Sequence, residues 1–160
     1  MTTLLLAGHA DFSLHPIFHE SSVASQNLTV QMPVTYVINA QERLIRTRCV
    51  GNVVVSEVIN HFRTLEHDPN CPDHLDVFLD VSETTSLPFT PEITSVAQEI
   101  NRVTKRVRFN FCAVVATGDA LFGMMRMFAV LAGAYFTEIR VFRAASEAEA
   151  WLAAQRSLVK

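Results

Sequence analysis

The chain has 160 residues, a formal net charge of −3 at pH 7 and a hydrophobic fraction of 49%. This length favours one domain with a single sizeable core, and the hydrophobic fraction excludes an intrinsically disordered chain. The negative net charge argues against a nucleic-acid-binding protein that works by neutralising phosphates.

The cysteine content and the start of the chain bear on location. Three cysteines without a CxxC pair indicate a reducing compartment rather than a disulfide framework. Cys49 and Cys112 lie in apolar strand patterns, where cysteine behaves as a small hydrophobic residue. The short apolar run near Met1 has no basic residues before it, so we expect no signal peptide. We therefore expect a cytoplasmic protein without a membrane span.

The first 31 residues differ from the rest because they show neither a strand-like nor a helix-like period. His9, His15 and His19 are scattered there among Ser, Gly and Pro residues. We expect residues 1–31 to form a poorly ordered N-terminal extension, which an upstream translation start would also explain. The folded domain is expected to span residues 32–160.

From Met32 onwards, two β-rich runs joined by a short polar connection predict a hairpin. In the second run, Ile45, Thr47 and Cys49 share one face. Strands and amphipathic helices then alternate, so the later strands should be parallel. The sequence predicts a single α/β domain, with a mixed sheet of about five strands in ββαβαβαβα order flanked by helices. The expected strands are 34–38, 43–50, 75–81, 110–116 and 138–142.

Signals at the ends of the helices predict where each begins. The first helix is expected over residues 54–66, and Thr90 with Pro91 forms an N-cap pair for the second. The third follows Thr117-Gly118-Asp119, and Ser146 with Glu149 predicts a capping box for the last. The last helix is expected to bury four apolar side chains, those of Ala148, Trp151, Leu152 and Leu158.

The helix after the central strand carries three methionines, Met124, Met125 and Met127, close to Phe122 and around a single charge, Arg126. The methionines are spread around the helix, so either it is buried on most sides or some of them line a pocket or a homodimer surface.

A sheltered guanidinium needs an acceptor. For Arg126 that acceptor is either Asp80 or Asp119 of this chain, or the acidic head of an amphipathic ligand.

Other groupings of reactive residues give weaker signals. His61, His67, Cys71 and His74 lie close in sequence, but their spacing matches no zinc pattern, and we expect no metal. The chain also lacks the G-x-S-x-G, G-x-G-x-x-G and Walker A sequences. We therefore expect no cofactor, and an enzyme ranks third among the functions considered.

Four segments resemble the STAS fold of anti-sigma factor antagonists, and more closely the SpoIIAA-like (STAS/CRAL-TRIO-related) family of small bacterial proteins. The likeness covers about Pro33 to Ala154. The segments that carry it are Phe78-Leu79-Asp80-Val81-Ser82, residues 122–128, Val141-Phe142-Arg143 and residues 148–152.

The resemblance also implies a site. STAS antagonists carry a phosphorylatable serine in an Asp-Ser-Ser-Gly turn at the start of a helix. The corresponding stretch here, residues 88–91, offers only Thr90 and lacks the acidic neighbour and the glycine. Thr90 is therefore the candidate phosphorylation site.

Two functions follow from the resemblance. The first is a non-enzymatic regulatory module that binds a protein partner, and the alternative is a carrier or sensor of a small apolar or acidic lipid-like ligand. A large apolar cavity under the Met-rich helix would favour the carrier, and a closed core with an exposed loop at residues 82–91 would favour the module. The candidate binding residues are Asp80, Ser82, Thr90, Phe122, Met125 and Arg126.

Overall fold

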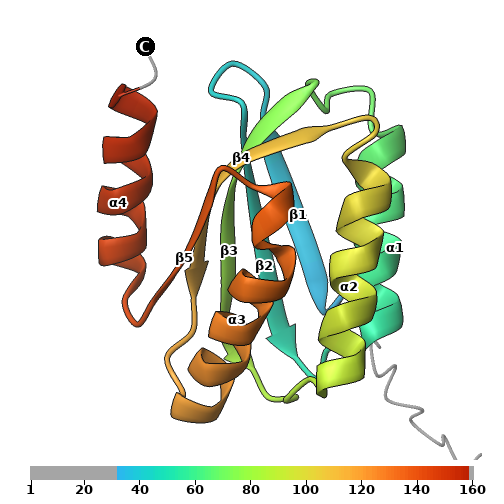
Figure 1. Ribbon diagram of the computed structural model, residues 1–160, viewed down its shortest axis with the longest axis vertical. Helices are drawn as coiled ribbons and strands as arrows, with labels where there is room; N and C mark the ends of the chain where they lie inside the picture. Colours follow the sequence, from blue (N-terminus) through green and yellow to red (C-terminus); the bar gives the residue numbers. More distant parts are fainter. Residues whose placement is uncertain (1–31, 159–160) are drawn as a thin grey trace, which may run out of the picture. The chain divides into compact units, whose positions relative to one another are not determined.

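The computed structural model describes residues 32–158 (Figure 1), so the extension expected at residues 1–31 lies outside the described part. The strands are β1 (Val34–Asn39), β2 (Leu44–Gly51), β3 (His74–Thr84), β4 (Arg108–Val115) and β5 (Glu138–Phe142). The helices are α1 (Val55–His67), α2 (Thr90–Val103), α3 (Asp119–Ala132), a short 3-10 turn (Gly133–Tyr135) and α4 (Ala145–Leu158).

The five strands form one mixed sheet in the spatial order β1-β2-β3-β4-β5. β1 and β2 are antiparallel, with Val34 opposite Cys49 and Asn39 opposite Leu44. The pairs β2–β3, β3–β4 and β4–β5 are parallel. The prediction of an α/β fold with a mixed five-stranded sheet is confirmed.

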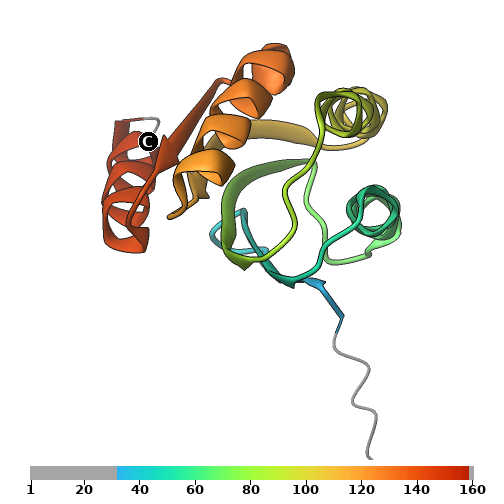
Figure 2. The ribbon, with the colours of Figure 1, turned by 90° about the horizontal axis from the view of Figure 1, so that it is seen from below.

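The helices lie on both faces of the sheet. Helices α1, α2 and α3 cover one face and α4 covers the other, as the view along the strands shows (Figure 2). The larger core lies under α1–α3 and includes Leu75, Ile100 and Val114, while Phe78, Phe111 and Trp151 belong to the smaller core under α4. Alternate residues of β3 and β4 supply the two cores because successive strand side chains point to opposite faces.

The α1 and α2 helices begin in the same way. The carboxylate of Glu57 accepts a hydrogen bond from the backbone N–H of Val54 (2.9 Å), and that of Glu92 accepts one from Phe89 (2.8 Å). Each carboxylate also places negative charge in the first turn, where the helix dipole favours it. Both N-termini lie at the carboxyl ends of the parallel strands.

Two predicted caps are wrong. Phe89 is the N-cap residue of α2 and Thr90 is the first residue of the helix, so the hydroxyl of Thr90 is not the cap. The α4 helix begins at Ala145, which places Ser146 inside the helix and rules out a capping box. The carboxylate of Glu149 instead accepts a hydrogen bond from Arg46 Nη2 at 3.0 Å.

Two other local predictions also need correction. β3 continues to Thr84, because Glu83 and Thr84 pair with Val50 and Gly51 beyond an irregularity in the β2–β3 register. Leu158 is 80% exposed, whereas Ala148, Trp151 and Leu152 are buried as predicted. Among the described residues, no helix is both long and apolar enough to cross a membrane.

Candidate functional site

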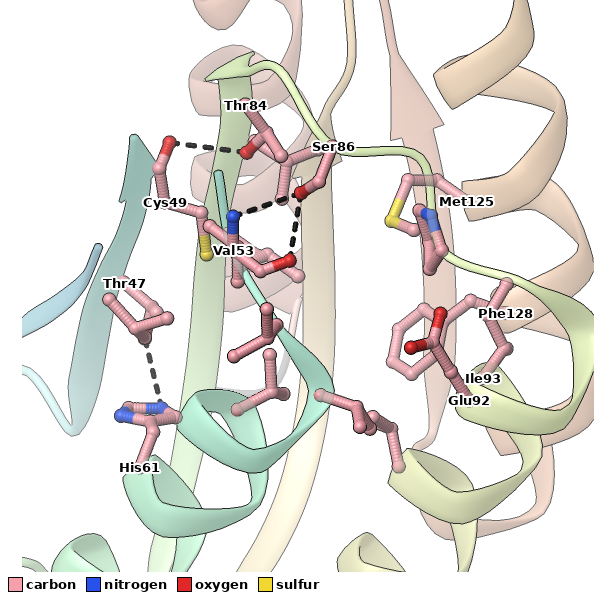
Figure 3. Close-up of a pocket in the computed structure, with 18 of the residues that line it drawn as sticks. Thr47, Cys49, Val53, His61, Thr84, Ser86, Glu92, Ile93, Met125 and Phe128 are labelled. Atoms are coloured by element: carbon pink, nitrogen blue, oxygen red, sulfur yellow. Dashed lines mark hydrogen bonds between the residues drawn. The ribbon is translucent and has the colours of Figure 1, made fainter. Parts of the chain in front are cut away.

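An apolar pocket of about 140 Å³ lies at the carboxyl edge of the sheet, enclosed by the first turns of α1 and α2 and by α3 (Figure 3). Thr47 and Cys49 of β2 line it on one side, and Leu121, Met125 and Phe128 of α3 line it on another. Parallel strands end at this edge and their helices begin there, which is where open α/β sheets commonly bind ligands.

The polar groups around the pocket mostly bond to one another. The Ser86 hydroxyl accepts a hydrogen bond from the Val53 N–H (2.9 Å) and donates one to the Val53 carbonyl (2.8 Å). The Thr84 hydroxyl donates to the Cys49 carbonyl at 3.3 Å. These bonds tie the loop after β3 to the segment before α1 and give the hydroxyls of Thr84 and Ser86 partners within the protein. The space that remains suits an apolar occupant.

His61 lies at the inner end of the pocket, on α1. Its Nε2 is 3.4 Å from the Thr47 hydroxyl, and its ring meets that of Tyr36 edge-on with 5.0 Å between ring centroids. Its Nδ1 is buried without a hydrogen-bond partner in the described part of the chain. Burial lowers the pKa of His61 to about 4, so the ring is neutral at pH 7.

The one thiol in the pocket is unsuited to nucleophilic chemistry. Burial, followed by the negative charges of Asp80 and Glu57, raises the pKa of Cys49 to about 11. A thiol needs a lowered pKa to react as the thiolate at neutral pH. The pocket therefore contains a neutral thiol and a neutral imidazole at pH 7.

Of the residues predicted for the site, Met125 lines the pocket. Asp80 and Ser82 lie together on β3, where Asp80 Oδ1 accepts hydrogen bonds from the Ser82 hydroxyl (2.6 Å) and backbone N–H (2.9 Å), but neither lines the pocket.

Thr90 is exposed, with its hydroxyl 3.9 Å from Met127 Sδ. Phe122 lies under the guanidinium of Arg143, whose Cζ is 4.3 Å from the ring centroid. The predicted residues therefore do not form one site.

The sheltered ion pair predicted for Arg126 is wrong. Arg126 is exposed and makes no ion pair with any residue in the described range. Asp119 pairs with Arg143 instead, at 2.8 Å. The buried stripe of α3 consists of Leu121, Met125, Phe128 and Ala132, and position 126 lies off this stripe.

The four residues considered as metal ligands also lie apart. His61 faces the pocket, Cys71 is buried, His67 Nδ1 is 2.8 Å from the Arg63 carbonyl and His74 Nδ1 is 2.7 Å from Asp73. Within residues 32–158, no group of three or more His, Cys, Asp or Glu side chains could hold a metal ion.

The pocket contains residues that sequence reasoning did not assign to a site, above all Thr47, His61 and Ser86. A signal for two of them was present. Thr47 interrupts the apolar face of its strand, and the helical spacing places His61 beside the apolar residues Val58 and Phe62. A polar group on an apolar face is the feature that marks them. Ser86 lies in a polar loop, where a serine is ordinary and gives no such signal.

Comparison of the chain with protein-family models and with curated proteins finds no match.

Proposed function

We propose that the chain is a non-enzymatic, STAS-like binding module that takes up a small apolar molecule in the pocket at the carboxyl edge of the sheet. The observation that supports this most is the pocket itself, which is lined mostly by aliphatic, aromatic and sulfur-containing side chains under the Met-rich α3. Support for the STAS-like fold is the antiparallel β1–β2 hairpin followed by parallel strands linked by helices.

The pocket's size sets the class of ligand. A volume of about 140 Å³ is close to that of apolar cavities that stay dry and accept benzene, roughly 150 Å³. It is below the range of drug-sized pockets, which begins at about 300 Å³. The ligand is therefore a single ring or a short branched chain. Thioether and aliphatic walls adapt to such a shape without needing polar contacts.

The surface beside the pocket is apolar too. Val54 lines the pocket and is 45% exposed, while Leu87 and Phe89 flank the lining residue Pro88 and are 49% and 72% exposed. These three side chains form an apolar rim. A ligand that enters from this side meets apolar surface along its way.

The same rim supports a second candidate function, the recognition of a protein partner by the loop at residues 85–89 and the start of α2. Exposed Leu and Phe side chains on a loop next to a helix N-terminus are suited to a partner contact. Thr90 follows Phe89 directly and is exposed, so a phosphate there would alter this surface. Phosphorylation of Thr90 and its role in such a contact stay predictions.

The test is binding of benzene to the full chain, with Val58→Phe as the blocking variant. Val58 lines the pocket, so a phenyl ring at this position should occupy it. Val130→Phe is the matched control, because Val130 lies on α3 and is 81% exposed. We expect benzene to shift the NMR signals of the pocket residues in the wild type and in Val130→Phe. In Val58→Phe the affinity should fall at least about tenfold, the effect of a contact worth about 1.4 kcal/mol.

Two outcomes would decide against the ligand-binding proposal. One is a wild-type protein that does not respond to benzene, and the other is a folded Val58→Phe variant that binds it as tightly as the wild type. Native mass spectrometry of the protein purified from its own host separates the two candidate functions. A retained small molecule supports the first, and a retained protein chain that is lost on Phe89→Ser supports the second.

A further inference from the structure

A second cavity, of about 810 Å³, lies at the opposite edge of the sheet. The strands β2, β3 and β4 begin at this edge (top of Figure 1). Arg43 immediately precedes β2, His74 opens β3 and Arg108 opens β4, while Arg156 reaches it from the last turns of α4. This edge takes no part in the proposed apolar site.

The carboxylates in this cavity already have partners. Asp76 is buried, and its Oδ2 lies 3.1 Å from Arg156 Nε while its Oδ1 accepts a hydrogen bond from the Phe111 N–H at 3.2 Å. The same guanidinium donates a hydrogen bond to the carbonyl of Glu42, and its Nη1 is 3.9 Å from that residue's carboxylate. Arg156 therefore neutralises the acidic side of the cavity.

Arg43 and Arg108 form no ion pair with a carboxylate of residues 32–158. The charged lining consists of three arginines and two carboxylates, Glu42 and Asp76, and one of the arginines already serves both carboxylates. Two cationic groups thus face a cavity whose negative charges are already paired.

Arg43 is also held in place. Its guanidinium donates a hydrogen bond to His74 Nε2, and His74 Nδ1 is 2.7 Å from Asp73 Oδ1. Both ring nitrogens of His74 thus have a partner, Nδ1 at Asp73 and Nε2 at Arg43. The register pairs His74 with Arg108, so the backbone of Arg108 lies beside that of the histidine that Arg43 contacts.

The backbone at Arg43 adds a second, independent observation. Its φ of 52° places it in the left-handed region, and no other non-glycine residue of the described range has a positive φ. Arginine adopts this conformation at an energetic cost, and such residues cluster at binding and active sites. Asn or Gly would adopt this conformation at lower cost.

We propose that this cavity binds a small oxyanion, a phosphate or carboxylate group, between the guanidinium groups of Arg43 and Arg108. Guanidinium groups match both oxyanions through paired N–H donors. The amide of Asn110 and the hydroxyl of Thr137 also line the cavity and offer neutral hydrogen bonds to the rest of the molecule. The module then carries two binding sites, one at each edge of its sheet.

Titration of the full chain tests the oxyanion proposal. The probes are inorganic phosphate and succinate, each added up to about 10 mM while the ionic strength is held constant. We expect saturable shifts of the backbone NMR signals of Arg43, His74 and Arg108. Tighter binding of inorganic phosphate indicates a phosphate group in the ligand, and tighter binding of succinate indicates a carboxylate group. If neither probe shifts these signals, the proposal is wrong.

Variants distinguish specific binding in this cavity from a general attraction of anions to the protein surface. Arg43→Asn keeps a residue that tolerates the left-handed conformation, and Arg108→Gln provides a second, independent removal of charge. Each should weaken binding at least about tenfold, as expected for a lost charged hydrogen bond. Arg126→Gln is the matched control because Arg126 is exposed and lies on α3, outside the cavity. An equal loss in Arg126→Gln, or none in the two cavity variants, would overturn the proposal.

Discussion

His61 carries the sharpest electrostatic feature of the candidate site. Its ring lies among Tyr36, Phe62 and the pocket's apolar walls, and its Nδ1 has no hydrogen-bond partner in the described range. Protonation would place a charge in this apolar setting, which is why its pKa falls to about 4. The ordinary pKa of histidine in an unfolded chain is about 6.5.

This difference predicts how stability changes with pH. The unfolded chain takes up a proton below about pH 6.5 while the folded ring stays neutral, so stability is complete above that pH and is lost as the pH falls towards about 4. Between pH 7 and pH 5 the loss from His61 alone is about 2 kcal/mol. His61→Phe should remove this loss and be at least as stable as the wild type at pH 7, because it also removes the unpaired nitrogen.

Urea unfolding of both proteins at pH 7 and pH 5 checks the prediction. Asp68 and Glu99 also have lowered pKa values, Asp68 chiefly through a backbone hydrogen bond from Asn70 and Glu99 through Arg102. Their contributions are lost at more acidic pH, as these carboxylates protonate, and are common to both proteins. Equal losses in the wild type and in His61→Phe between pH 7 and pH 5 would show that the imidazole is protonated in the folded state.

At the scale of elements, α4 is the one helix on its face of the described sheet. It packs on β3, β4 and β5 through Ala148, Trp151 and Leu152. The Trp151 ring meets Phe111 at 90° with 6.1 Å between centroids, and the Arg140 guanidinium lies 5.2 Å from its centroid. Its indole Nε1 is buried without a hydrogen-bond partner among residues 32–158.

Trp151→Ala should therefore lower the free energy of unfolding by roughly 3–5 kcal/mol, as large-to-small changes in a core do. Trp151→Phe is the matched control. It keeps an aromatic ring and removes the unpaired N–H, so it should cost less than half as much. Denaturant unfolding measures both. A loss under about 1 kcal/mol for Trp151→Ala would mean that α4 is held chiefly by its polar contacts.

The elements best predicted from the sequence are those whose pattern follows one physical rule. β5 has the predicted bounds, and side chains of β3 alternate between the two cores, with Leu75 and Val81 in one and Phe78 in the other. The end of β3 could not be predicted in this way. Ser82, Glu83 and Thr84 are polar, and the strand reaches Thr84 through pairing with Val50 and Gly51 beyond an irregularity in the β2–β3 register.

The candidate site was less predictable than the fold because it is assembled from distant segments. Met125 was predicted from the unusual composition of α3, but its pocket neighbours Thr47 and Ser86 come from β2 and the loop after β3. The burial of Arg126 was predicted wrongly, because an apolar helix suggests that all its positions are sheltered. The structure shows a single buried stripe on α3, with Val130 81% and Leu131 40% exposed beyond it.

At the scale of the whole molecule, the sheet separates two kinds of surface. Its carboxyl edge has the apolar pocket, where the Ser86 and Thr84 hydroxyls bond within the protein, and its amino edge has the arginine-lined cavity. The parallel arrangement of β2, β3 and β4 causes this division, because it gathers three strand starts at one edge and three strand ends at the other. Substitutions at one edge should leave binding at the other unchanged.

The described sheet and its helices contain their own cores, and this predicts the effect of truncation. A chain that starts at Met32 keeps every described element, so its melting temperature should lie within a few degrees of the full chain's. The control starts at Ala40 and lacks β1. It loses Val34 from the core and Tyr36, whose hydroxyl donates a hydrogen bond to Asp68 Oδ2 at 2.9 Å, and it should melt far lower. Calorimetry compares the three proteins. A fall of about 8 °C or more for the Met32 chain, about 2 kcal/mol in a domain of this size, would show that residues 1–31 contribute to its stability.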